Sequence, residues 1–94
     1  MDFQKQEGRI FALGTDGELL AEVTFPTGPD GIADINHTFV DESLRGHGGV
    51  LQLSGALLQA AAQELRAQGR KTKTSCWYAA QWFAKHPQEQ DLLA

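Results

Sequence analysis

The chain has 94 residues, of which 41% are apolar, a net charge of −4 and a single cysteine. This length and apolar content support one modest core, so we expect a single domain spanning residues 1–94. The negative charge argues against a nucleic-acid partner, because binding to phosphates needs an excess of lysine and arginine. With only Cys76 available and no cysteine and histidine cluster around it, we expect neither an internal disulfide nor a metal site. No apolar run is long enough to cross a bilayer and no secretion signal is evident, so we expect a cytoplasmic protein with no membrane partner.

Charge is divided unevenly along the chain. Residues 1–42 hold nine carboxylates against Lys5 and Arg9, whereas residues 43–88 hold six basic residues against Glu64 alone. The common explanation is an ordinary solvated surface, and the sharper one is an anion site in the second half. The acidic first half would attract a cationic ligand.

The first part of the chain predicts three strands. Residues 6–13 and 18–25 flank the turn sequence Asp16-Gly17 and therefore read as a hairpin. After a stretch rich in glycine and proline, residues 32–40 predict a third strand. An unbroken strand there would place Ile35, His37 and Phe39 on one face, because strand side chains alternate.

The second part predicts a long helix, a short strand and a short helix. Apolar residues recur with helical spacing, and Gly69 is well placed to end the long helix with a positive φ. Gly55 is the weak point inside this helix. Residues 71–75 predict a fourth strand, and residues 77–86 predict a helix that ends before Pro87. This order of elements indicates an α+β fold in which helices cover a sheet.

A glycine-rich segment, Arg45-Gly46-His47-Gly48-Gly49, connects the third strand to the long helix. Glycines let a main chain approach a ligand closely, and the first N–H groups of a helix have no partner within it, so such a segment can bind a pyrophosphate. Arg45 would add a charged contact. A glycine-rich turn before a helix is more often only a turn, and the residues alone leave both interpretations open.

Three segments together resemble the GCN5-related N-acetyltransferase superfamily, and in particular its very small, YjdJ-like branch. They are residues 34–48, the segment Ser75-Cys76-Trp77-Tyr78-Ala79 and the segment Phe83-Ala84-Lys85-His86-Pro87. The resemblance implies a mixed, mostly antiparallel sheet covered by one long and one short helix. It also implies a transferase that takes an acetyl group from acetyl-CoA.

The same resemblance implies where coenzyme A would bind. In this family the pattern Gln/Arg-x-x-Gly-x-Gly/Ala holds the pyrophosphate; Arg45 and Gly48 match it, and Val50 occupies the place of the final small residue. The interval from Arg45 to Gly69 is about one helical turn longer than the resemblance predicts, with the additional residues near 49–52. The family's pantetheine arm lies along main-chain groups at the end of the third strand. The predicted cofactor-binding residues are Phe39, Val40, Arg45, Gly46, His47, Gly48, Gly49 and Val50.

Cys76 and His37 are the candidate catalytic residues, because the resemblance places them near the ends of the two strands that flank the pantetheine arm. Cys76 could protonate the leaving thiolate or itself accept the acetyl group, and His37 could act as the base. The alternatives are a buried, inert cysteine and a core histidine bonded to a main-chain carbonyl. His86, which precedes a proline, reads as an aid to the end of a helix.

The predicted function is therefore an acetyl-CoA-dependent N-acetyltransferase whose amine acceptor is unknown, a peptide or protein amine being one candidate. Two alternatives stay open: a non-catalytic module of the same fold that binds coenzyme A or a protein, and a redox or acyl-carrying role for Cys76.

Overall fold

The computed structural model describes residues 2–44 and 49–94, with the main chain alone for residues 49–52. Its strands form two sheets: a four-stranded antiparallel sheet in the order β1-β2-β3-β5, and a parallel pair of β4 with β6. The strands are β1 (Gln4–Gln6), β2 (Arg9–Leu13), β3 (Leu19–Thr24), β4 (Ala33–Ile35), β5 (His37–Val40) and β6 (Thr72–Thr74). The fold is mixed α+β and mostly antiparallel, as the sequence predicts.

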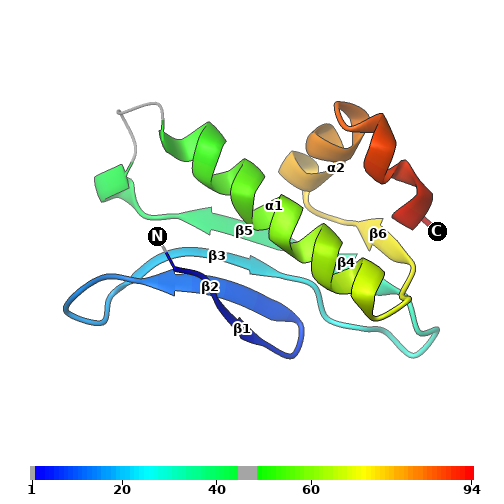
Figure 1. Cartoon of the computed structure of the whole chain (residues 1–94), viewed down its shortest axis with the longest axis horizontal. Helices are drawn as coiled ribbons and strands as arrows, with labels where there is room; N and C mark the ends of the chain where they lie inside the picture. Colours follow the sequence, from blue (N-terminus) through cyan, green and yellow to red (C-terminus); the bar gives the residue numbers. More distant parts are fainter. Residues whose placement is uncertain (1, 45–48) are drawn as a thin grey trace.

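Within residues 2–44 and 49–94, two α-helices and two 3-10 helices accompany the strands. The long helix α1 lies over the sheet, and α2 with the C-terminal segment lies beside it, over β6 (Figure 1). No helix within the described ranges is long and apolar enough to cross a membrane. The helical elements are η1 (Glu42–Leu44), α1 (Gly49–Ala67), α2 (Trp77–Ala84) and η2 (Pro87–Leu92).

The first predicted strand, residues 6–13, is wrong at its start. The chain instead makes a two-residue turn at Glu7 and Gly8, and the short strand β1 pairs back onto β2 with Gln6 opposite Arg9. Gly8 has φ +69°, a conformation that glycine adopts without a steric penalty. The turn at Asp16-Gly17 is confirmed, with Gly17 at φ +85°.

The predicted third strand, residues 32–40, is divided between the two sheets. His37 stands opposite Thr24 of β3, and the N–H of Asn36 donates to the same Thr24 carbonyl at 3.2 Å. Two residues of one strand therefore oppose one of the other, which is a β-bulge. The side chain of Asn36 also accepts a hydrogen bond from the Thr24 hydroxyl. Beyond the bulge the chain pairs with β3, and before it β4 pairs with β6.

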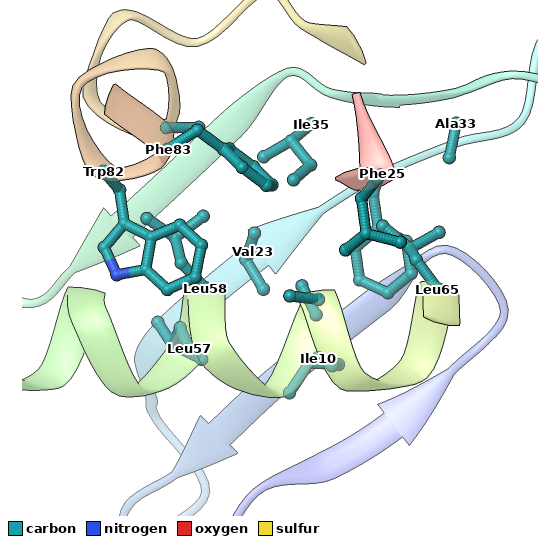
Figure 2. Close-up of a cluster of buried hydrophobic side chains, with 14 of the residues drawn as sticks. Ile10, Val23, Phe25, Ala33, Ile35, Leu57, Leu58, Leu65, Trp82 and Phe83 are labelled. Carbon is teal, nitrogen blue, oxygen red and sulfur yellow. The ribbon is translucent and has the colours of Figure 1, made fainter. Parts of the chain in front are cut away.

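The core lies between the four-stranded sheet and the helices (Figure 2). Leu57, Leu58 and Leu65 of α1 are fully buried, since they fall on one face of the helix. Burying each leucine stabilises the fold by roughly 1.5–3 kcal/mol. The core also contains side chains from the strands, from Phe25 just after β3, from α2 and from η2; they include Ile10, Val23, Phe25, Ile35, Trp82, Phe83 and Leu92.

The end of α1 confirms the predicted glycine stop. Gly69 has φ +66°, its N–H donates to the carbonyl of Arg66, and the N–H of Arg70 donates to that of Leu65. These two hydrogen bonds define a Schellman motif, which satisfies carbonyls that the helix leaves open.

The C-terminal segment is held against α1 and β6. The predicted helix over residues 77–86 ends earlier, at Ala84, and Pro87 begins η2. Arg66 of α1 forms ion pairs with Glu89 and Asp91, and the N–H of Ala94 donates to the Thr72 carbonyl at 2.8 Å. The segment after Pro87 is therefore part of the packed structure.

Candidate functional site

The two sheets part at the bulge, and we call this place the strand junction: residues 35–38 on one side and residues 74–76 on the other. The carbonyl of Ile35 accepts hydrogen bonds from the N–H groups of Ser75, at 3.1 Å, and of Cys76, at 3.0 Å. Beyond these hydrogen bonds β5 continues along β3, whereas the segment that follows β6 turns into α2. The junction is the point at which the fold brings the predicted catalytic segments together.

Cys76 lies on the core side of the junction. It is partly buried, packs against the hydrophobic core, and directly precedes the first residue of α2. Its Sγ is 3.7 Å from Oγ1 of Thr38, a contact within reach of a hydrogen bond that involves sulfur. Thr38 is thus the side chain that meets the thiol, and it was not among the predicted site residues.

His37 lies on the opposite face of the sheet. Thr38 stands opposite the buried Val23, whereas His37 stands opposite Thr24 on the other face. The His37 side chain is 54% exposed, and its Nε2 is 3.9 Å from Oε1 of Glu22. The structure therefore does not place His37 beside Cys76.

The prediction that Ile35, His37 and Phe39 share a face is wrong for a physical reason. Ile35 is fully buried in the core, and the bulge at Asn36 shifts the alternation by one residue before His37. The alternative of a core histidine is also wrong, since His37 is exposed. Asparagine is disfavoured inside strands, and Asn36 was the one signal in the sequence for this break.

Phe39 and Val40 lie on β5, where the resemblance predicts main-chain contacts to pantetheine. The N–H of Asp41 donates to the Leu20 carbonyl, so in the alternating antiparallel pattern the main-chain groups of Phe39 point toward β3. Those of Thr38 and Val40 point away from β3, toward the side on which α2 begins. Val40 is buried, and Phe39 is partly exposed on the face that carries Glu22.

Arg45, Gly46, His47 and Gly48 of the predicted cofactor loop lie outside the described residues. Gly49 and Val50 begin α1, and residues 49–52 are helical, so this part of the additional length belongs to the helix. The first turn of α1 contains no acidic residue, which leaves the positive end of the helix dipole uncompensated by its own side chains.

Two basic residues of the second half, Arg66 and Arg70, lie at the other end of α1. At a rise of about 1.5 Å per residue, Arg66 lies on the order of 25 Å from the start of α1 at Gly49. Arg66 is paired with Glu89 and Asp91, and Arg70 donates to the Gly31 carbonyl at 3.4 Å. These residues are too far away to help hold a pyrophosphate at the start of α1.

The pKa values at this end follow from the pairing. Hydrogen bonds from Arg66 hold the pKa of Asp91 below its ordinary value, and hydrogen bonds to Asp91 and Glu89 raise the pKa of Arg66.

A surface pocket of about 320 Å³ opens near this end of α1, and its lining includes Phe25, Gln68 and Arg70. It contains none of the predicted site residues.

His86 supports the end of α2, as the sequence predicts. Its Nδ1 is 2.6 Å from the Trp82 carbonyl and must carry the hydrogen, because a carbonyl only accepts. The rings of His86 and Trp82 are stacked with centroids 4.1 Å apart.

In the described part of the chain, no three histidine, cysteine or acidic side chains gather into a candidate metal site.

Comparison with known proteins agrees with the overall fold. A solution NMR structure of a GCN5-like protein from Staphylococcus aureus, described as a candidate N-acetyltransferase, is similar to this chain with a TM-score of 0.71. The two are 24% identical over 99% of this chain and 87% of the other, a likeness that establishes the fold. No curated protein matches. The family model for GCN5-related N-acetyltransferases matches residues 10–92, and the chain therefore belongs to that family.

Proposed function

We propose that this protein transfers an acetyl group from acetyl-CoA to an amine, with Cys76 and His37 as its catalytic residues. The family match over residues 10–92 is the observation that carries the proposal. The position of Cys76 at the strand junction supports the choice of this thiol, because the main chain parts there and a substrate arm could lie along β5.

The proposed binding of coenzyme A uses the glycine segment and the start of α1. Arg45, Gly46, His47 and Gly48 would surround the pyrophosphate, and the N–H groups of Gly49 and Val50 would add to the positive end of the helix. Val40 would contact the pantetheine arm from the side of β5 that faces away from β3, and Phe39, whose main-chain groups point toward β3, would take part only as its neighbour on the strand. The helix start fits an anion, since no carboxylate occupies its first turn.

The opposite placement of the two candidate residues is compatible with acetyl transfer. The protonated amine must lose one proton before its nitrogen attacks the thioester carbonyl and forms the C–N bond; the nitrogen then loses a second proton and the C–S bond breaks. The coenzyme A thiolate that leaves takes up a proton. Because the acceptor nitrogen and the leaving sulfur are different atoms, His37 would serve the first and Cys76 the second from two sides of the junction.

The test compares the parent with Cys76→Ala and His37→Ala across a library of primary amines, with free coenzyme A measured by chromatography. General acid and base groups contribute roughly 10²–10⁴-fold, so each variant should lose at least 100-fold in kcat. Gln4→Ala is the matched control, since Gln4 is exposed on the same sheet face as His37 and distant from the junction. Parental rates in both catalytic variants would remove these two assignments.

Two other outcomes separate the alternatives. Calorimetry that finds coenzyme A binding, with no turnover of any amine, would identify a non-catalytic binding module. Intact-mass measurement after incubation with acetyl-CoA would detect an acetyl group on Cys76, and loss of that adduct in Cys76→Ala would show a covalent route.

A peptide or protein amine is the proposed acceptor class, because residues 1–42 carry a strong excess of carboxylates. That excess attracts a cationic ligand at long range. Association rates for lysine peptides should accordingly fall as the salt concentration rises.

A further inference from the structure

The carboxylate of Asp34 connects β4 to the turn that precedes α2. Its Oδ1 accepts the N–H of Ser75 at 2.9 Å, and its Oδ2 accepts the Ser75 hydroxyl at 2.6 Å. Both oxygens of one side chain thus hold a single residue 41 positions away in the sequence. This is a geometrically specific contact, since it fixes the main chain and the side chain of Ser75 together.

Asp34 is itself held in place by its main chain. Its N–H donates to the Pro26 carbonyl at 2.9 Å, and in the parallel pairing of β4 with β6 it stands opposite Lys73. Its neighbours Ala33 and Ile35 are fully buried. The carboxylate therefore projects from a fixed strand and can impose its position on the turn.

The turn that it holds leads directly into Cys76. No side chain caps the start of α2, so the direction in which the chain enters this helix depends on the residues just before it. Besides Asp34, the carbonyl of Ile35 accepts the N–H groups of Ser75 and Cys76, and the carbonyl of Cys76 accepts the Ala80 N–H within α2. Cys76 is the next residue after Ser75, and its Sγ lies 3.7 Å from Oγ1 of Thr38.

We propose that Asp34 is a positioning residue, which holds Ser75 so that the Cys76 thiol stays beside Thr38 at the strand junction. The inference rests on the proposed function, because it gives the thiol a reaction to be positioned for. Asp34 acts indirectly: it touches neither substrate nor Cys76, and it acts by holding Ser75 in place.

The experiment uses Asp34→Ala, which removes both hydrogen bonds, and Asp34→Asn, whose amide can still accept the Ser75 N–H and donate to its hydroxyl. Asp30→Ala is the matched control: Asp30 also accepts a main-chain N–H, that of Ile32 at 3.0 Å, in an exposed turn away from the junction. Two assays are run: one gives the rate at which iodoacetamide alkylates Cys76, and the other gives kcat and KM for acetyl transfer. Thermal unfolding of each variant reports on folding.

In Asp34→Ala the alkylation rate should rise at least roughly threefold, because the turn opens more often and exposes the partly buried thiol. Its kcat should fall about tenfold with KM for acetyl-CoA little changed, since a displaced group costs rate and not binding. Asp34→Asn should recover most of both quantities, and Asp30→Ala should match the parent.

An alkylation rate in Asp34→Ala at or below that of the parent would overturn the inference, as would equal losses of kcat in Asp34→Ala and Asp30→Ala. If the parent itself transfers no acetyl group, the proposed function fails, and the alkylation rates alone still decide whether Asp34 positions the thiol.

Discussion

Gly55 lies inside α1 with no conformational need for glycine. A Cβ at this position would meet the Trp82 Nε1 atom at 3.9 Å, an ordinary contact, and its φ is not positive. Gly55→Ala should therefore raise the free energy of unfolding by about 0.5–1 kcal/mol, since alanine loses less chain entropy in a helix. Urea titration measures the change.

Gly69 supplies the control of opposite sign. Its φ is +66° and a Cβ there would meet nothing within 4 Å, so only the backbone conformation opposes a side chain. Gly69→Ala should lower the free energy of unfolding by roughly 1 kcal/mol. Equal effects of the two substitutions would contradict the assignment of Gly69 as the helix stop.

Thr72 has a buried hydroxyl that no described group satisfies. The residue is fully buried in β6, and its Oγ1 has no hydrogen-bond partner among the described residues. Thr72→Val keeps the shape and removes the unpaired oxygen, so it should stabilise the protein by about 1 kcal/mol. Thr72→Ala should instead destabilise it, because it leaves a void. Thermal unfolding of both variants would test the pair.

The ion pairs that join η2 to α1 make stability depend on pH at the acid end. Because Arg66 lowers the pKa of Asp91 in the folded state, this contribution is fully present above the ordinary value of 3.8 and is lost as the pH falls through the lowered pKa. The parent should therefore melt at a higher temperature than Asp91→Asn at neutral pH, and the two should converge in acid. High salt should reduce the difference at neutral pH. A constant difference at every pH would contradict this account.

The division of residues 32–40 between two strands shows which element depends on distant partners. Each half has strand-like residues, so the presence of extended chain could be predicted. The bulge at Asn36 forms because Thr24 of β3 offers both a carbonyl and a hydroxyl to that residue. This partner lies twelve positions away, and local alternation carries no information about it.

For the molecule as a whole, coenzyme A should act as a stabilising ligand of the folded state. At a concentration of 100 times Kd it should add about 2.7 kcal/mol to the free energy of unfolding, and the melting temperature should rise with concentration. Arg45→Ala should weaken this binding roughly tenfold, by the loss of a charged hydrogen bond. Arg70→Ala, at the other end of α1, should leave it unchanged. A melting temperature that ignores coenzyme A at millimolar concentration would contradict the proposed cofactor.

Helix positions, the glycine stop at Gly69 and the turn at Asp16-Gly17 could be inferred from the chain alone, because each depends on residues within a few positions of one another. The family resemblance could be inferred as well, from three short segments taken in order. Which face His37 occupies depends on the bulge formed with Thr24, twelve positions from Asn36. The contact of Thr38 with Cys76 and that of Asp34 with Ser75 span 38 and 41 positions. Those contacts exist only after β4 has paired with β6 and β5 with β3, since a one-residue shift in pairing turns every following side chain to the other face.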